Sequence, residues 1–524
     1  MVPFPTTPNT RYLSNDAGYL LIKSIDREDW STVLHLSGPV FYFFGFTLLI
    51  PVLIALGMQE WNSLFDFFIT ALLFILLGQI LKKVFKPKHD AMWLHGMGVA
   101  AFSWLVVMLL GALPYYLSGH FLSFLDCCLD TMSGMTTTGL ILIQDVDHLA
   151  VSMNIWRHML TFIGGQGIVI IALSFIPVLG IGFKAMVGEG KEERMVPNVR
   201  DTGRAIWMIS LIYLAVGTLL FFIIGLFAGL KPGWSLFHGV TLFMSTWSTG
   251  GFAPQSQNVI YYHNFPIEIV CALIAIIGSM NFGLHYYIWF KQKKELIKDI
   301  ETKSLMITMT LTLMIVVFGL IKQGLYPNFL SLVRKSIFLL VSGHTTTGTM
   351  NIYTIQFINL WGPLALLGLI IAMAFGGSSA STAGGFKGLR IGIAVRGIFA
   401  DIKKIFTPTG SVVVEKYNHI EEGVLSDKLV RGAISIILLY IVIYAGGAVL
   451  GMMHGYPVMS ALFESVSAGS NSGLSCGITM PGMPWDMKVY YILAMWLGRL
   501  EFTAIIVFFT MIVRSVIQKR HISR

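Results

Sequence analysis

Four short polar runs, each built around a glycine, contain the residues of this sequence that could bind an ion. They read SGMTTTGL (133–140), MSTWSTGGF (244–252), SGHTTTGT (342–349) and SNSGL (470–474), and each follows an apolar segment too short to cross a membrane. Backbone carbonyls and hydroxyls can replace the hydration shell of a cation, and glycine permits the φ angles that turn carbonyls toward one axis. Four such loops around one axis would form a cation site.

The predicted ligands lie at and just before the four glycines. They are Thr137, Thr138 and Gly139; Thr249 and Gly250; Thr346, Thr347 and Gly348; and Asn471, Ser472 and Gly473. The second glycine stays open, because Gly251 directly follows Gly250. If each preceding apolar segment is helical, the negative end of its dipole points at the site and favours a cation. For one run alone, a reentrant turn with small residues for helix packing is the alternative.

A second stretch, AFGGSSASTAGGFK (374–387), interrupts an otherwise apolar span. Half of its residues are Gly or Ser, and each glycine weakens a helix by up to about 1 kcal/mol relative to alanine. Amides freed within a membrane need protein or water partners, so we expect this loop to face an internal cavity and to act as a gate. The alternative is an ordinary cytoplasmic connector. The predicted gate residues are Gly376, Gly377, Ser378, Ser379, Ala380, Ser381, Thr382, Ala383, Gly384 and Gly385.

Arg499 is the third candidate, because it lies near the middle of an apolar segment. Arginine at that depth costs about 2.5–3.5 kcal/mol to insert, and intramembrane charges usually serve a function. Glu501 is two residues away, so it cannot share the helix face of Arg499 and is expected to point elsewhere. A fixed positive charge beside a cation filter acts as an electrostatic barrier, which assigns Arg499 to the gate. The alternative is a buried arginine that serves only helix packing.

Composition places all these residues in a membrane protein. Of the 524 residues, 55% are hydrophobic and 12% are charged, against roughly 25% charged in soluble chains. The net charge of +9 comes from short basic clusters between apolar segments, which indicates membrane topology and no nucleic-acid partner. The four cysteines show no CxxC spacing, so they predict neither a disulfide framework nor a cysteine zinc site.

Ten segments are long and apolar enough to be spans, at about 20 residues for each crossing. They are 36–57, 63–84, 96–118, 152–183, 206–230, 264–290, 304–324, 358–405 (interrupted), 427–453 and 488–515. Alternate loops are rich in Lys and Arg, which places both termini in the cytoplasm. Arg334 and Lys335 fall in an outside loop and are the exception.

The spans and polar runs repeat as span, short helix, polar loop, span. The sequence therefore predicts an all-α polytopic membrane protein with four parallel repeats around a pseudo-fourfold pore. The expected divisions are 1–90, a cytoplasmic segment with two extra spans, then repeats at 91–204, 205–303, 304–426 and 427–524, with the gating loop in the third. Asp126, Asp130 and Glu464 lie on the short helices and could attract cations to the outer mouth, with local pairing as the alternative.

The motifs resemble those of the Trk/Ktr/HKT superfamily of potassium transporters. The resemblance rests on the four runs together with WRHMLTFIGGQGI (156–168), IEIVCALIAIIGSMNFGLHYY (267–287), GGSSASTAGGFKGLR (376–390) and LGRLE (497–501). The two extra N-terminal spans make the TrkH-type subunit the most similar. The resemblance implies one filter glycine per repeat, a gate of loop and arginine, a homodimer, and regulation by a cytosolic RCK/KTN-type ring that binds ATP/ADP or NAD. Two departures stand out, SNSGLS in the fourth filter and His344 in the third.

Together these features predict a pore-forming subunit for potassium uptake in the inner membrane of a bacterial or archaeal cell, in contact with membrane lipid. Four filter glycines are the pattern associated with potassium in this superfamily. An enzyme is not expected, since the sequence has no P-loop, no HExxH motif and no ATPase-like domain, and no cofactor is expected in this chain. Two alternatives are the potassium-binding subunit of a P-type ATPase complex and a secondary cation symporter, which predicts inverted repeats.

Overall fold

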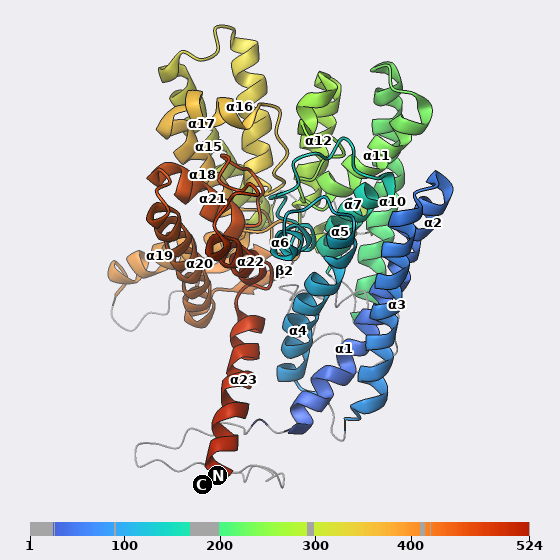
Figure 1. Ribbon diagram of the computed structural model, residues 1–524. Coiled ribbons are helices and arrows are strands. Elements are labelled where there is room, and N and C mark those ends of the chain that lie inside the picture. The colour runs from blue at the N-terminus through green and yellow to red at the C-terminus, as the bar shows by residue number, and fades with distance from the viewer. Residues whose placement is uncertain are drawn as a thin grey trace.

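The computed structural model describes residue 25 and residues 27–87, 91–167, 199–290, 298–408, 414–419 and 421–522. Across these ranges the chain is almost entirely helical (Figure 1), and the strands are the short antiparallel pair β1 (Lys416–His419) and β2 (Glu421–Val424), in which Lys416 faces Val424. The prediction of an all-α polytopic membrane protein is confirmed, with this hairpin as a small addition.

The helices follow one another in the order that the apolar pattern predicts. Those that precede the second polar run are α1 (Arg27–Thr47), α2 (Leu49–Met58), α3 (Trp61–Val84), α4 (Trp93–Gly111), α5 (Leu113–Leu117), α6 (Phe124–Met135), α7 (Val151–Gln166), α10 (Val199–Phe227) and α11 (Pro232–Trp247). Those that follow it are η1 (Asn258–Tyr262), α12 (Phe265–Gly278), α13 (Phe282–Phe290), α15 (Ile300–Gln323), α16 (Phe329–His344), α17 (Thr354–Leu360), α18 (Gly362–Phe375), α19 (Gly388–Ile405), α20 (Asp427–Met453), α21 (Val458–Gly469), α22 (Trp485–Arg499) and α23 (Thr503–Ile522).

Six of the predicted spans are unbroken helices or nearly straight helix pairs long enough to cross a membrane within the described ranges. They are Arg27–Met58, Trp61–Val84, Trp93–Leu117, Gly203–Phe227, Ile300–Gln323 and Asp427–Met453. The predicted span 358–405 is interrupted, as expected, and forms α17, α18 and α19. The predicted span 152–183 begins as α7, and its part from residue 168 lies outside the described residues.

Two predicted spans are bent sharply, which corrects the expectation that 264–290 and 488–515 are continuous. α12 and α13 meet at 97°, and α22 and α23 at 115°. In the second case Glu501 and Phe502 adopt φ angles of 51° and 66°. Residues other than glycine rarely adopt this left-handed conformation, and a residue that does so ends a right-handed helix. Each bend carries polar residues, Ser279 and Asn281 in the first and Arg499 and Glu501 in the second, but the apolar residues on either side add up to the length of one span, which suggested straight helices.

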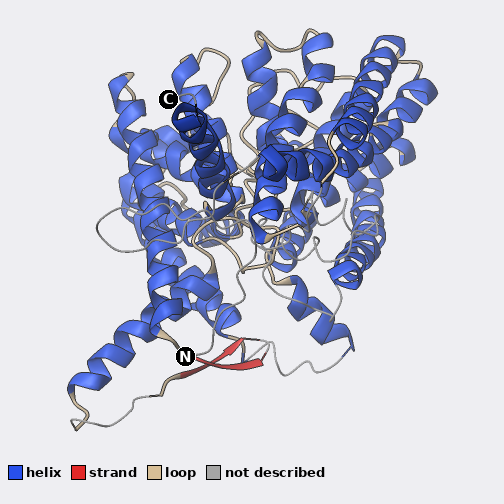
Figure 2. Cartoon of the chain, turned by 90° about the horizontal axis from the view of Figure 1, so that it is seen from below, coloured by secondary structure: helices blue, strands red, loops and turns tan. Residues whose placement is uncertain are grey.

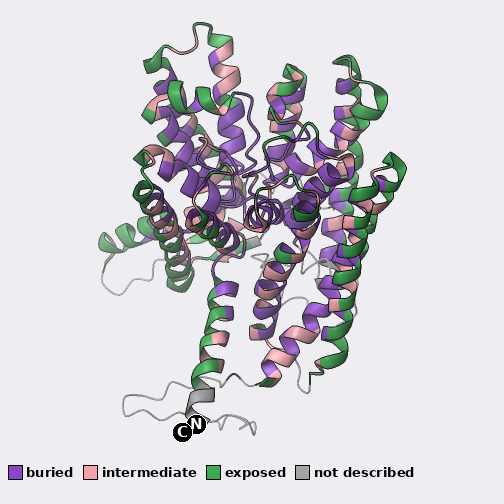
Figure 3. Ribbon diagram, viewed as in Figure 1, coloured by how far each residue is buried: buried purple, intermediate pink, exposed green. Residues whose placement is uncertain are grey.

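The outer helices present apolar side chains outward, as lipid contact requires. Along α3, for example, Phe65, Phe68, Leu72 and Ile80 are exposed. Its inner face packs closely on α1, where a Cβ added to Gly78 would lie 2.9 Å from the Gly38 carbonyl oxygen, the close backbone approach that small residues allow between membrane helices. Burial is concentrated where the chain is least regular, around the central loops (Figure 3).

Four short helices, α6, α11, α16 and α21, end at these central loops. Seen from below, the longer helices surround the loops, and the β1–β2 hairpin lies at one side (Figure 2). The four short helices correspond to the four apolar segments that precede the polar runs in the sequence.

Candidate cation filter and intramembrane loop

The four short helices end in the same backbone motif. One residue beyond each C-cap takes a left-handed conformation, namely Thr137, Thr249, Thr346 and Asn471, with φ between 52° and 57°. The next amide then donates back to a helix carbonyl in all four cases: Thr138 to Ser133, Gly250 to Ser245, Thr347 to Ser342 and Ser472 to Ser467, at 2.7–2.9 Å. This is the six-to-one bond of a Schellman motif, so the four polar runs fold alike. We call residues 136–139, 248–251, 345–348 and 470–473 the glycine loops.

The glycine loops meet in a closed ring. A Cβ added to Gly139 would strike the carbonyl of Gly250, and a Cβ on Gly251 the carbonyl of Thr347. In the same way Gly348 lies against the carbonyl of Ser472, and Gly473 lies against the carbonyl of Thr138, which returns to the first loop. The four glycines also have positive φ angles, from 69° to 94°. Glycine is required at these positions by both backbone conformation and close approach.

The ring assigns the second glycine to Gly251. Gly251 has the positive φ and the neighbouring carbonyl that Gly139, Gly348 and Gly473 have, whereas a Cβ on Gly250 would meet the side chain of Thr161. Alignment of the runs on Gly250 is therefore shifted by one residue. Gly250 corresponds to Thr138 of the first loop, and its carbonyl is the group that faces Gly139 in the ring.

The two unusual residues of the sequence motifs bond to side chains and to a carbonyl outside the ring of carbonyls. The Asn471 amide donates to the Thr138 hydroxyl at 3.0 Å and to the Met495 carbonyl at 2.9 Å, so it fastens the fourth loop to the first and to α22. The His344 ring is hydrogen-bonded to Thr308 of α15 at 2.8 Å. Neither side chain therefore replaces a carbonyl in the ring.

The predicted gating stretch, which we call the intramembrane loop (376–385), packs against all four glycine loops. Thr137 donates its hydroxyl to the Thr382 carbonyl at 3.3 Å, and the Thr249 hydroxyl donates to the Thr382 hydroxyl at 3.2 Å. The Gly384 amide donates to the Thr346 hydroxyl at 2.8 Å, and a Cβ on Gly384 would strike the carbonyl of Ser470. Nine of the ten loop residues are buried, which disfavours the alternative of an ordinary cytoplasmic connector.

Hydrogen bonds within the intramembrane loop hold its two ends together, and we call this closely spaced pair of ends, Gly376–Gly377 and Gly384–Gly385, the neck. Gly377 donates to the Gly384 carbonyl at 3.3 Å, and the Ser381 hydroxyl donates to the Ser378 carbonyl at 2.6 Å. The close approach at the neck requires Gly376 and Gly385, since a Cβ on either would strike the opposite strand and both have positive φ.

Backbone groups of the α12–α13 bend and the Glu301 side chain anchor the same loop. The Ser378 amide donates to the Ser279 carbonyl at 3.0 Å, in the bend between α12 and α13, and the Ala380 carbonyl accepts from the Phe282 amide at 3.1 Å. Ser379 donates its amide to Glu301 of α15 at 2.7 Å, and its hydroxyl also donates to that carboxylate. The loop is held in one defined position by neighbours on both sides.

Arg499 joins the intramembrane loop to the end of α7 and to the first glycine loop. Its guanidinium donates to the Thr382 carbonyl at 2.6 Å, to the Gly164 carbonyl at 2.6 Å and to the Gly165 carbonyl at 3.1 Å. It also reaches the Thr137 hydroxyl at 3.4 Å. The arginine therefore lies where the loop, the end of α7 and the first glycine loop meet.

Glu501 has partners other than Arg499, as expected, but the cause is the bend after α22 and not the spacing of the two residues on one helix. It pairs with Arg390 of α19 and lies 3.9 Å from the Lys387 ammonium, and all three side chains are largely buried. Lys387 also donates to the Ala383 carbonyl of the intramembrane loop.

Three glycines that the sequence analysis did not single out position the helices that follow the glycine loops. A Cβ on Gly164, Gly278 or Gly498 would strike the carbonyl of Met135, Trp247 or Gly469, respectively, each four residues before a ring glycine. Each lies within a residue or two of the place where its helix ends. The sequence does offer a sign of these positions, because FIGGQ, AIIGS and WLGRL each contain a glycine near the end of an apolar segment.

The acidic residues on the short helices α6 and α21 are engaged locally. Asp126 pairs with Lys488 at 2.6 Å, and Asp130 accepts from the Leu142 amide at 2.6 Å. Glu464 accepts from the amides of Cys476 and Ile478 at 3.0 and 3.1 Å. Local pairing, the alternative considered for these residues, agrees with these contacts, since the carboxylates fasten the chain that follows the glycine loops.

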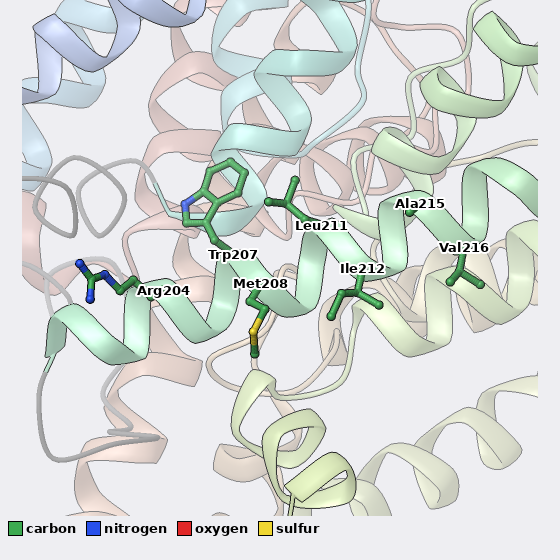
Figure 4. A pocket seen from close by; sticks show the side chains of 7 residues that line it. All are labelled: Arg204, Trp207, Met208, Leu211, Ile212, Ala215 and Val216. Carbon is green, nitrogen blue, oxygen red and sulfur yellow. The ribbon is translucent and has the colours of Figure 1, made fainter.

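A hollow of about 580 Å³ lies along the outside of α10 and is lined by Arg204, Trp207, Met208, Leu211, Ile212, Ala215 and Val216 (Figure 4). All of these residues belong to one helix and all but Arg204 are apolar. The hollow therefore has the character of a lipid-facing surface and lacks the converging polar groups of a ligand site.

The fold and the ring define a polytopic membrane protein with one central site made by four equivalent loops. The family described as TrkH, cation transport protein, matches residues 63–517, and the chain belongs to this family.

Relatives and a solved structure match over most of their length. An uncharacterized cation transporter of Methanocaldococcus jannaschii is 29% identical, with 93% of this chain and 96% of the relative covered. The Trk system potassium uptake protein TrkG of Escherichia coli strain K12 is 28% identical, with 91% and 97% covered. The crystal structure of the potassium transporter TrkH from Vibrio parahaemolyticus superposes with a TM-score of 0.77 at 23% identity, covering 91% of this chain and 98% of that one.

Proposed function

We propose that this chain is the pore-forming subunit of a potassium uptake system and that the glycine ring is its selectivity filter. The observation that carries the proposal is the closed ring itself, in which Gly139, Gly251, Gly348 and Gly473 each lie against the carbonyl that precedes the next glycine. Such a ring presents backbone oxygens from four sides, which is how a cation is stripped of water and bound. The relatives named as potassium uptake proteins support potassium as the ion.

The path through the ring is closed by the intramembrane loop and Arg499. Thr382 contacts the first two glycine loops, Gly384 contacts the other two, and the Arg499 guanidinium lies against the Thr382 carbonyl. A fixed positive charge at this place opposes the passage of a cation through low-dielectric surroundings. Conduction then requires the loop and Arg499 to separate from the glycine loops, and the membrane potential supplies about 2.3 kcal/mol per charge per 100 mV to drive entry.

The assembly and its regulation complete the proposal. The resemblance of the motifs to the TrkH type supports a homodimer in the cell membrane, with both termini cytoplasmic, regulated by a cytosolic RCK/KTN-type ring that binds ATP/ADP or NAD. The division into four repeats at 91–204, 205–303, 304–426 and 427–524 is part of the same proposal, and the common Schellman ending of α6, α11, α16 and α21 supports it. Four loops of one conformation do not favour the inverted repeats of a symporter.

Complementation tests the proposal in cells. A bacterium that lacks its potassium uptake systems is transformed with this gene, alone and with a gene for an RCK/KTN-type protein from the same genome. We expect growth at limiting potassium with the pair, and rubidium uptake by the same cells. Normal membrane expression without any rescue or uptake would overturn potassium transport, whereas equal rescue with and without the second gene would overturn only the regulatory part.

A further inference from the structure

Three side chains of types that can bind a metal lie together outside the proposed filter and gate, where the β1–β2 hairpin meets α15. The His419 Nδ1 is 2.9 Å from the Asp299 Oδ1 and 4.0 Å from the Glu301 Oε2, and the three potential ligand atoms lie within 4.8 Å of one another. The side chains of Asp299 and Glu301 are 1% and 0% exposed, and that of His419 is 10% exposed. We propose that this cluster is a binding site for a divalent transition-metal ion such as Zn²⁺.

Hydrogen bonds from the protein orient both carboxylates, with the Asp299 Oδ1 and the Glu301 Oε2 on the side of His419. The Asp299 Oδ2 accepts from the amide and hydroxyl of Thr302, at 2.9 and 3.3 Å. The Glu301 Oε1 accepts from Ser379, and its Oε2 accepts from Asn281 at 3.3 Å. Hydrogen bonds of this kind fix the orientation of metal ligands in known sites and raise their affinity.

The ligand set favours a transition metal over magnesium or calcium. Zn²⁺ accepts imidazole nitrogen and carboxylate oxygen at about 2.0–2.2 Å, whereas the other two ions take oxygen ligands. Ligands of a tetrahedral ion at that distance are about 3.4 Å apart, so a small movement of the His419 ring would bring the three atoms into place. An ion of charge +2 would also neutralise two buried carboxylates that face one point.

A cavity gives the cluster access to solvent. It has a volume of about 530 Å³ and lies among the hairpin, α19 and α20, with His419 and Ser379 in its wall. Arg390 also lines it and is paired with Glu501. A metal ion can therefore reach His419 without unfolding of the surrounding helices.

The position of the cluster gives metal binding a structural consequence. A metal held by His419, Asp299 and Glu301 would fasten the hairpin to the start of α15. Through Glu301 it would also reinforce the anchor of Ser379 in the intramembrane loop. Binding itself depends on these three side chains and does not depend on the proposed potassium transport.

Metal titration of the purified full-length chain tests the proposal. The protein is stripped with a chelator in detergent, and bound Zn²⁺ is measured at increasing ZnCl₂ by mass spectrometry after equilibrium dialysis. We expect saturation at one Zn²⁺ per chain, with affinity reduced at least about tenfold in His419→Ala and in Asp299→Asn. His454→Ala is the matched control, since His454 pairs with Asp486 elsewhere in the fold, and its affinity should equal that of the parent.

Two results of the zinc titration would overturn the site. One is the absence of saturable zinc binding by the intact chain, and the other is equal binding by the parent, His419→Ala and Asp299→Asn. If either variant fails to elute as a monodisperse species, X-ray absorption at the zinc edge of the parent decides the question. A first shell of nitrogen and oxygen with imidazole scattering is expected, and a sulfur shell would reject these ligands. Displacement of Zn²⁺ by equal Mg²⁺ would reject the transition-metal class.

Discussion

The Arg499 guanidinium lies 2.6 Å from the carbonyl oxygen of Thr382, although 117 residues separate the two in the chain. This bond joins the end of α22 to the loop that interrupts the third repeat. The same guanidinium also holds the carbonyls at the end of α7. The proposed gate is therefore one connected structure made by the first, third and fourth repeats.

Removal of Arg499 should open the path. With Arg499→Ala, the positive charge and its bonds to Thr382 and Gly164 disappear, so we expect ion leak to rise. A tenfold rise corresponds to a loss of about 1.4 kcal/mol from the barrier. Rubidium flux into liposomes containing the purified protein, with no regulator present, measures it. Arg431→Ala, an exposed position on α20, is the control. Unchanged or reduced flux in Arg499→Ala, at normal reconstitution, would rule out a barrier at this position.

The Thr382 hydroxyl should stabilise the closed state independently of the arginine. It donates to the Gly278 carbonyl at 2.8 Å and accepts from Thr249. Thr382→Val keeps the side-chain shape and loses these bonds, and a buried hydrogen bond is worth about 0.5–1.5 kcal/mol. We therefore expect basal flux to rise about two- to tenfold.

The control for this variant is Thr310→Val, because Thr310 on α15 is exposed and bonds only to its own helix in the described contacts. Equal flux in Thr382→Val, Thr310→Val and the parent would show that the hydroxyl has no part in closure.

The pair of Arg390 and Glu501 should support the bend between α22 and α23. Arg390→Ala leaves the buried Glu501 carboxylate with Lys387 at 3.9 Å. Loss of one partner of a buried ion pair costs about 3–5 kcal/mol. The thermal midpoint in detergent should therefore fall clearly. Lys404→Ala is the control, because Lys404 forms an exposed pair with Asp401. Surface pairs contribute about 0–1 kcal/mol, so this variant should change the thermal midpoint little. Similar midpoints for the two variants would contradict this account.

Much of the site could be predicted from the sequence because its residue types are unusual for a membrane span. Glycine with threonine or serine within apolar segments predicted the four loops, the run at 376–385 predicted the interrupted helix, and the position of Arg499 predicted a charge with partners inside the protein. The similarity of the four loops could be recognised in the sequence because a Schellman motif requires similar residues at the end of each helix.

Other features could not be read from the sequence, for definite physical reasons. Gly250 and Gly251 are chemically identical, and only the ring separates them. The bend at Glu501 depends on positive backbone φ angles at Glu501 and Phe502, which these residue types do not announce. The partners of Arg499 are backbone carbonyls, which every residue has. His419 and Asp299 are 120 residues apart in the chain, so their contact depends on the tertiary fold.

Selectivity is the property that the glycine ring should control. A side chain at Gly139 would enter the space beside the Gly250 carbonyl and displace ring oxygens. For Gly139→Ser we therefore expect the permeability ratio of potassium to sodium to fall about tenfold, a change of about 1.4 kcal/mol. Gly348→Ser should act in the same direction, because Gly348 lies against the Ser472 carbonyl. Gly482→Ser is the control, since a Cβ at Gly482 would meet no atom within 4 Å.

The most direct test of the central proposal is the ratio of potassium to sodium permeability, measured by reversal potential for the purified protein in a planar bilayer. The parent and Gly482→Ser should prefer potassium, and Gly139→Ser and Gly348→Ser should lose that preference while the protein still conducts. A parent that conducts both ions equally, or a ratio that stays the same in conducting Gly139→Ser and Gly348→Ser, would contradict the assignment of the glycine ring as a potassium filter.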